Sequence, residues 1–215
     1  MLDWAKIETV LLDMDGTLLD KYYDDYFWER YIPEIYAKQN GLNTVEAGKK
    51  LLAIYKAKEG TLDWTDLDYW SDQLALNIPA LKIKVSHLIK IHPYVVDFLE
   101  FLSQSSKRVY LVTNAHSKTL DIKMKKTSLN GYFDRIICAA EVGKPKEDTS
   151  FWPGLKKIIN FSRETTMLAE DTEKILQSAQ AYGIKHLIYV ARPSSRKAIK
   201  KSSHFTSIIY FNELI

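Results

Sequence analysis

The sequence predicts an α/β protein with a doubly wound, mostly parallel sheet, a Rossmann-like core and an inserted helical cap. Short, continuous apolar runs recur along the chain, and such runs are typical of strands buried on both faces of a parallel sheet. Segments with apolar residues at helical spacing separate most of these runs. The interval of residues 20–90 breaks this alternation because it contains helical patterns and no good strand candidate.

The predicted strands and helices follow one another in a regular order. The strands are the apolar runs IETVLLD (7–13), RVYLVTN (108–114), RIICAA (135–140), TTMLAED (165–171), HLIYVA (186–191) and SIIYF (207–211). The helices between them are PYVVDFLEFLSQS (93–105), SKTLDIKMKKTSL (117–129), SFWPGLKKII (150–159) and TEKILQSAQAYG (172–183). This order predicts a parallel sheet with helices on both faces.

The interval of residues 20–90 is predicted to be a helical cap, and residues 1–19 and 91–215 form the core. Its helical stretches are residues 24–40, 44–60 and 64–76. Thr65 and Asp68 resemble a capping pair at the start of the last of these. The basic, serine-rich stretch of residues 191–204 is expected to be a solvated helix or loop.

Composition excludes several classes of function. A net charge of +3 is too small to indicate nucleic acid or an anionic membrane as the main partner. The single cysteine, Cys138, lies in an apolar run, where a buried core residue is expected rather than a catalytic thiol. No signal peptide is recognisable, and no apolar run approaches the roughly 20 residues that a membrane helix needs. We expect a cytoplasmic monomer or homodimer with no nucleic-acid or membrane partner.

Polar side chains follow several of the predicted strands. In a parallel sheet, ligands bind beyond the carboxyl ends of the strands, so these side chains are expected to meet in one crevice. Carboxylates that are brought together repel one another unless a cation joins them, and an all-oxygen set suits Mg²⁺. The strand-end residues are Asp13, Asp15, Thr113, Asn114, Glu170 and Asp171.

The same residue types suit phosphoryl transfer. One carboxylate can act as the nucleophile and form an aspartyl-phosphate. A second carboxylate two residues on can protonate the leaving oxygen and later activate water. A hydroxyl and a lysine neutralise charge on the transferring group, and Thr113 and Lys144 are the candidates for these roles.

Four motifs, in chain order, resemble the signatures of the haloacid dehalogenase-like superfamily of phosphatases: DMDGTLLD, TNA, GKPKED and AEDT. The helical insert lies where the C1-type cap of that family lies. The resemblance implies that Asp13 is the nucleophile and that Asp15 is the general acid and base. It also implies that Mg²⁺ is held by Asp13, the backbone carbonyl of Asp15, and Asp171. The dehalogenase branch lacks an acid at the position of Asp15, so this residue favours a phosphatase.

The resemblance also assigns the phosphate-binding residues. Thr113, with Asn114 beside it, is expected to bind phosphoryl oxygens, and a lysine of the third motif steadies both the phosphate and Asp13. The motif offers Lys144 and Lys146 for this role, and the common Lys-Pro order favours Lys144. In the fourth motif Glu170 stands where Gly or Asp is usual, which leaves its effect on the metal site open.

A narrower resemblance concerns the substrate. The segments DWAKIETVLLDMDGTLLD, DDYFWERYIPE, LDYWSDQL and TNAHSKTL resemble the GMP/IMP 5′-nucleotidase branch, which implies a purine mononucleotide as the small phosphorylated metabolite that the protein binds. The alternatives are a phosphoglycolate- or sugar-phosphate phosphatase, a phosphomutase, or a catalytically silent binding module. Most cap aromatics are expected to pack in the cap core, with one or two touching a nucleobase. They are Tyr22, Tyr23, Tyr26, Phe27, Trp28, Tyr31, Trp64, Tyr69 and Trp70.

Overall fold

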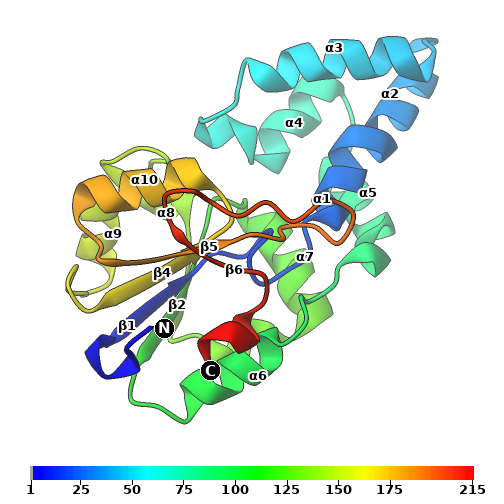
Figure 1. Cartoon of the computed structure of the whole chain (residues 1–215). Helices are drawn as coiled ribbons and strands as arrows, with labels where there is room; N and C mark the ends of the chain where they lie inside the picture. The colour runs from blue at the N-terminus through cyan, green and yellow to red at the C-terminus, as the bar shows by residue number, and fades with distance from the viewer. Residues whose placement is uncertain (1) are drawn as a thin grey trace.

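Six parallel strands form the sheet at the centre of the computed structural model, which describes residues 2–215 (Figure 1). The strand order is β3-β2-β1-β4-β5-β6, so the order reverses beside β1. The doubly wound α/β fold that the sequence predicts is therefore confirmed. The strands are β1 (Thr9–Leu12), β2 (Arg108–Thr113), β3 (Arg135–Cys138), β4 (Thr166–Glu170), β5 (His186–Val190) and β6 (Thr206–Ile208).

The central strand β1 shows why these runs are continuously apolar. Its four residues are all buried, because alternate side chains point to opposite faces of the sheet and a core covers each face. Val10 and Leu12 join the larger core, which includes α6 (Val95–Ser103), while Leu11 joins the smaller core on the other face. The remaining core helices are α7 (Ser117–Thr127), α8 (Ala139–Val142), α9 (Phe151–Ile158) and α10 (Glu173–Tyr182).

The cap is helical and lies beyond the carboxyl ends of the strands (Figure 1). Its first long helical segment is continuous, because a π-helical turn over Phe27–Tyr31 joins its α-helical ends. The fifth cap helix, Ile78–Lys84, was not predicted. The cap helices are α1 (Tyr22–Tyr26), α2 (Ile32–Asn40), α3 (Thr44–Lys56), α4 (Leu67–Leu74) and α5 (Ile78–Lys84).

The capping pair predicted at the start of α4 is wrong. The N-cap residue is Asp66, whose carboxylate accepts hydrogen bonds from the backbone N–H groups of Asp68 and Tyr69 at 2.8 and 3.2 Å. Asp66 has extended backbone dihedrals, as an N-cap residue requires, whereas Thr65 has helical ones and ends the preceding 3₁₀ turn.

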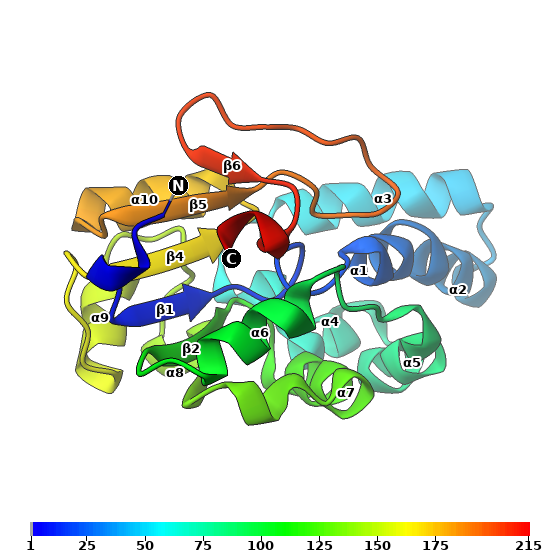
Figure 2. The same ribbon diagram turned by 60° about the horizontal axis from the view of Figure 1, so that its bottom comes forward.

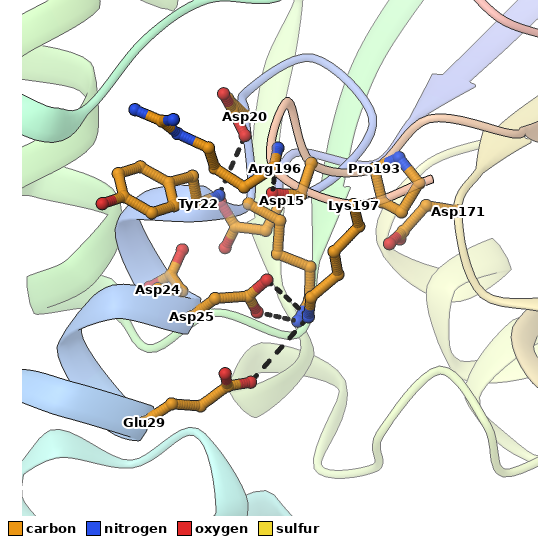
Figure 3. A network of polar contacts seen from close by, with 12 residues as sticks. Asp15, Asp20, Tyr22, Asp24, Asp25, Glu29, Asp171, Pro193, Arg196 and Lys197 are labelled. Atoms are coloured by element: carbon orange, nitrogen blue, oxygen red, sulfur yellow. Dashed lines mark hydrogen bonds and ion pairs between the residues drawn. The ribbon is translucent and has the colours of Figure 1, made fainter. Parts of the chain in front are cut away.

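The segment of residues 191–204 is a loop that extends from β5 to the cap and returns to β6 (Figure 2). It is largely exposed, as expected of a solvated loop, and its first half also contacts the start of the cap. The backbone N–H of Ser195 donates to Asp20 at 3.0 Å, and Lys197 Nζ lies 2.6 Å from Asp25 Oδ2 (Figure 3). Figure 3 also shows Pro193 near Asp171. The loop therefore borders the carboxyl edge of the sheet.

Candidate active site

A cavity of about 440 Å³ lies between the cap and the carboxyl ends of β1, β2 and β4. Its floor is formed by polar residues of the core, and aromatic residues of the cap form its wall. The floor residues include Asp13, Asp15, Thr113, Asn114, Lys146, Glu170 and Asp171, and the aromatic residues are Trp28, Tyr55, Trp64 and Trp70.

The loop after β1 presents two aspartates to this cavity. Asp13 extends the strand, since its N–H donates to the carbonyl of Ala169 at 3.1 Å. Met14 is fully buried in the core, and Asp13 and Asp15 on either side of it line the cavity. Gly16 has a φ of +90°, and a Cβ at this position would overlap the carboxylate of Asp171. Glycine is therefore needed both for the left-handed backbone and for the close approach of this loop to the Asp171 side chain.

The lysine beside Asp13 is Lys146, and the prediction of Lys144 is wrong. The Lys146 side chain is 1% exposed, and its Nζ donates to Asp13 Oδ1 at 2.5 Å, to Glu170 Oε2 at 2.7 Å and to the carbonyl of Val112 at 3.0 Å. Lys144 is 54% exposed and lies 3.7 Å from Asp148 on the surface.

The backbone around Lys146 explains why this lysine, and not Lys144, reaches Asp13. Asn114 Oδ1 accepts a hydrogen bond from the N–H of Lys146 at 3.0 Å, which anchors that residue beneath the end of β2. Asn114 Nδ2 donates to Glu147 at 2.8 Å. The Asn114 side chain thus positions the lysine loop. Its amide nitrogen carries a second N–H, and the residue lines the cavity, so the predicted contact with a phosphoryl oxygen stays a prediction.

Glu170 completes the surroundings of the lysine. It is 1% exposed, and its Oε1 accepts from the backbone N–H groups of Asp171 and Thr172 at 3.0 and 3.1 Å. The additional methylene of Glu over Asp lets its other oxygen reach Lys146. Glu170 therefore holds the lysine and the turn after β4, which are its contacts in this structure.

Asp13, Glu170 and Asp171 form a group that we call the carboxylate cluster. Each offers an oxygen, and these oxygens lie within 4.8 Å of one another. Burial, followed by repulsion from neighbouring carboxylates, raises the pKa of Asp13 to about 7 and that of Asp171 to about 6. Burial also raises the pKa of Glu170 to about 8, although Lys146 opposes this shift.

The carboxylate cluster fits a hard divalent cation. Lys146 contacts Asp13 and Glu170 but makes no ion pair with Asp171, so negative charge is left uncompensated when all three carboxylates are ionised, and the donor atoms are all oxygens. Glu170 already accepts hydrogen bonds at both oxygens, so Asp13 and Asp171 are the side chains that could hold the ion. The expected third ligand, the backbone carbonyl of Asp15, belongs to the adjacent loop.

Thr113 lies at the end of β2 and is 1% exposed. Its Oγ1 accepts a hydrogen bond from the N–H of Ala115 at 3.0 Å, which leaves the hydroxyl proton available for donation into the cavity. This geometry suits the predicted contact with a phosphoryl oxygen.

Asp15 is held by residues that the sequence analysis missed. Lys123 of α7 donates to Asp15 Oδ1 at 2.5 Å and to Asp24 Oδ2 at 2.5 Å, and Lys82 of α5 donates to Asp24 Oδ1 at 2.7 Å. Burial disfavours the charged form of Lys123, but the two carboxylates outweigh it and raise its pKa. The available signal was spacing: Lys123 falls four residues after Thr119 on the inward face of its helix.

The cap wall resolves which aromatic residues face the cavity. Of the predicted set, Trp28, Trp64 and Trp70 line it, together with Tyr55, which was not considered. Trp70 is almost fully buried and packs edge-on against Tyr55, whereas Trp64 is 40% exposed. His116 also lines the cavity, and its Nε2 lies 3.5 Å from Asp66 Oδ1.

Comparisons with known proteins agree with this geometry. The model of the haloacid dehalogenase-like hydrolase family matches residues 10–189. The GMP/IMP nucleotidase YrfG of Escherichia coli is 36% identical over 212 residues, which cover 99% of this chain and 96% of that protein. A phosphorylated carbohydrates phosphatase of Thermotoga maritima is 23% identical over 188 residues, 84% of each chain. The crystal structure of a HAD phosphatase from Thermococcus onnurineus has the same fold, with a TM-score of 0.81, 19% identity and coverage of 97% and 96%. No helix among residues 2–215 is long and apolar enough to cross a membrane.

Proposed function

This chain belongs to the haloacid dehalogenase-like hydrolase family and is a phosphatase, and on that premise we propose that it hydrolyses purine 5′-mononucleotides such as GMP and IMP. We propose further that the reaction is Mg²⁺-dependent and passes through an aspartyl-phosphate on Asp13. The observation that carries this proposal is one continuous cavity that joins the floor around Asp13 to an aromatic wall in the cap.

In the proposed first step, Asp13 attacks the phosphorus atom of the substrate. Lys146 holds Oδ1 of Asp13, which leaves Oδ2 as the attacking oxygen. A bond forms between Oδ2 and phosphorus, the ester P–O bond breaks, and Asp15 gives its proton to the departing nucleoside oxygen. Thr113 donates its hydroxyl proton to a phosphoryl oxygen and so stabilises the charge on the transferring group.

In the second step, Asp15 takes a proton from a water molecule that attacks phosphorus. The P–Oδ2 bond breaks, which releases inorganic phosphate and restores the Asp13 carboxylate. The same residue thus serves as acid and then as base, as general acid–base catalysis by one side chain allows.

The proposed metal site consists of Asp13, Asp171 and the backbone carbonyl of Asp15. Its support is the carboxylate cluster, whose charge Lys146 balances only in part. Mg²⁺ bound there would neutralise the repulsion between the carboxylates and the phosphate. The protein's own side chains orient the nucleophile and transfer the proton: Lys146 holds Asp13, and Asp15 donates and accepts the proton.

The aromatic wall supports a nucleobase as the far end of the substrate. Stacking of one base on an aromatic ring contributes about 1–3 kcal/mol, and Trp28 and Trp64 are the cavity-lining rings with exposed surface. The choice of guanine and hypoxanthine rests on the name of the E. coli relative, whose similarity extends through the cap.

A phosphate-release panel with Mg²⁺, and with EDTA as the metal-free control, tests these proposals. We expect GMP and IMP to be the best substrates among GMP, IMP, AMP, phosphoglycolate and sugar phosphates. Asp13→Asn is expected to abolish turnover, and activity surviving in this variant would exclude the covalent mechanism.

One alternative substrate class has its own support. The T. maritima relative is named for phosphorylated carbohydrates, and a sugar phosphate would also fit the core of this site. Robust hydrolysis of a sugar phosphate with no turnover of any nucleotide would select this alternative. No turnover of any phosphate ester would favour the silent binding module instead.

A further inference from the structure

Four charged side chains form a chain of ion pairs at the cavity, in which two partly buried aspartates alternate with two buried lysines. Asp15 and Asp24 share the ammonium group of Lys123, with both N–O distances at 2.5 Å, and Asp24 also accepts from Lys82 at 2.7 Å. These residues come from the loop after β1, from α1 and α5 of the cap, and from α7 of the core. We call them the Lys123 network.

Both lysines of the Lys123 network are almost inaccessible to solvent. The side chains of Lys123 and Lys82 are 1% and 2% exposed. Burying an ammonium group costs several kcal/mol unless it is well paired, so lysines are rarely placed there without partners. Lys82 Nζ also lies 4.8 Å from the ring centroids of Tyr23 and Phe27, which anchors it inside the cap.

Pinning the cap to the core does not require a contact with Asp15. Other pairs of the cap and the core already link the two parts, among them the exposed pair of Lys118 with Asp68, and Lys197 with Asp25. Lys123 differs from these lysines because it ends on the residue proposed to be the acid and base. It does not line the cavity, whereas Asp15 does, so Lys123 lies behind Asp15 and away from the substrate.

The chemistry of the contact limits what Asp15 can do. An ammonium group only donates hydrogen bonds, so Asp15 Oδ1 must accept from Lys123. A proton carried by Asp15 therefore resides on Oδ2, which makes Oδ2 the atom that exchanges protons with the leaving oxygen and with water. Asp24 accepts a second hydrogen bond from the same ammonium group and so helps to keep it in place.

We propose that Lys123 is a positioning residue that orients the Asp15 carboxylate for proton transfer, and that Asp24 of the cap holds Lys123 in register. This inference rests on the proposed function, because it assigns Asp15 the role of acid and base. It identifies a specific structural requirement: α7 must place a lysine behind the first motif, and α1 of the cap must supply the second carboxylate.

The test compares two leaving groups. A nucleoside alkoxide leaves only when it is protonated, whereas p-nitrophenolate is a stable anion that needs no proton. In Lys123→Met, we expect kcat/KM for GMP to fall by about 10²-fold, the lower end of the contribution of general acid catalysis. We expect kcat/KM for p-nitrophenyl phosphate to fall by less than about tenfold. A merely structural defect would lower both values equally.

Two further variants keep the test decisive. Lys123→Met combined with Asp24→Asn removes one positive and one negative charge, so the interior stays balanced, and the same selective loss is expected. Lys125→Met changes an exposed lysine of the same helix and should affect neither substrate. Equal losses for the two substrates, or an unchanged rate with GMP, would overturn the positioning role.

A crystal structure of the double variant separates this proposal from the proposed function. We expect the Asp15 side chain to adopt a different or a mixed orientation, and an unchanged single orientation would overturn the inference. If the wild-type protein hydrolyses a sugar phosphate but no nucleotide, the nucleotide proposal fails, and the leaving-group comparison is made with the sugar phosphate. If the wild type hydrolyses no phosphate ester, the proposed function fails, and with it the role assigned to Lys123.

Discussion

Replacing Lys146 with methionine should destabilise the fold and remove activity, whereas the same change at Lys144 should do neither. Methionine retains much of the volume of lysine, but it leaves Asp13 and Glu170 buried without the ammonium group that both contact. Lys144 lies on the surface, and its pairing with Asp148 is long and exposed. The two substitutions are therefore chemically identical changes two residues apart.

The size of the expected effect follows from burial. Removing one partner of a buried ion pair costs about 3–5 kcal/mol. The pKa of Glu170 is raised to about 8, so this carboxyl takes up a proton readily when its lysine is lost. We therefore expect Lys146→Met to lower the free energy of unfolding by about 3 kcal/mol, the lower end of this range. An exposed ion pair contributes about 0–1 kcal/mol, so Lys144→Met should have no larger effect.

Urea denaturation in EDTA measures the stability of both variants, and phosphate release from GMP in Mg²⁺ measures their activity. We expect kcat of Lys146→Met to fall by about 10²–10³-fold, as when one preorganised charge donor is removed from an active site. Loss of activity in Lys144→Met with retention in Lys146→Met would refute the assignment of the lysine.

Three further predictions concern the backbone, the metal and the cap. Gly16→Ala should abolish phosphate release, because the added Cβ would displace the Asp171 carboxylate. Gly41→Ala is the control: its Cβ would meet no atom, so the variant carries only the left-handed backbone strain of roughly 1–2 kcal/mol and should remain active. In EDTA, the free energy of unfolding should fall as pH rises from about 4 to 8. The reason is that the raised pKa values of the carboxylate cluster make the folded protein bind more protons than the unfolded one in this range. Denaturation at several pH values should show this slope, and Mg²⁺ should flatten it. Trp64→Ala should raise KM for GMP by about 5–150-fold, which corresponds to the loss of about 1–3 kcal/mol of stacking. The control is the inhibition constant for inorganic phosphate, which should not change. An unchanged KM for GMP would show that Trp64 does not bind the base.

Much of the core could be predicted because short stretches of sequence indicate where the strands lie. Apolar runs mark the strands, and parallel strands end at one edge of the sheet, so Asp13 and Asp171 were expected to lie near each other although they are 158 positions apart. The cap was harder to predict at its ends. Its fifth helix begins at Ile78 with a proline at its second position, and it is too short for a clear apolar period.

The assignment of the lysine shows where local pattern stops being informative. Lys144 and Lys146 flank Pro145, and both lie within reach of the same strand end when only spacing is considered. The hydrogen bond from the Lys146 backbone to Asn114, a residue 32 positions away, decides which of them turns inward. A contact between distant segments is absent from any short window of sequence.

The sequence by itself determined the sheet, the edge at which its ligands bind, and the two aspartates that the first strand delivers there, because each follows from short-range periodicity and from the direction of parallel strands. Only the tertiary structure decided that Lys146 contacts Asp13, that Glu170 holds this lysine, and that Lys123 reaches Asp15. The physical reason is burial: a charged side chain is stable in the interior only where its partners converge on it. Those partners come from segments whose meeting is set by the packing of the cap and helices against the sheet.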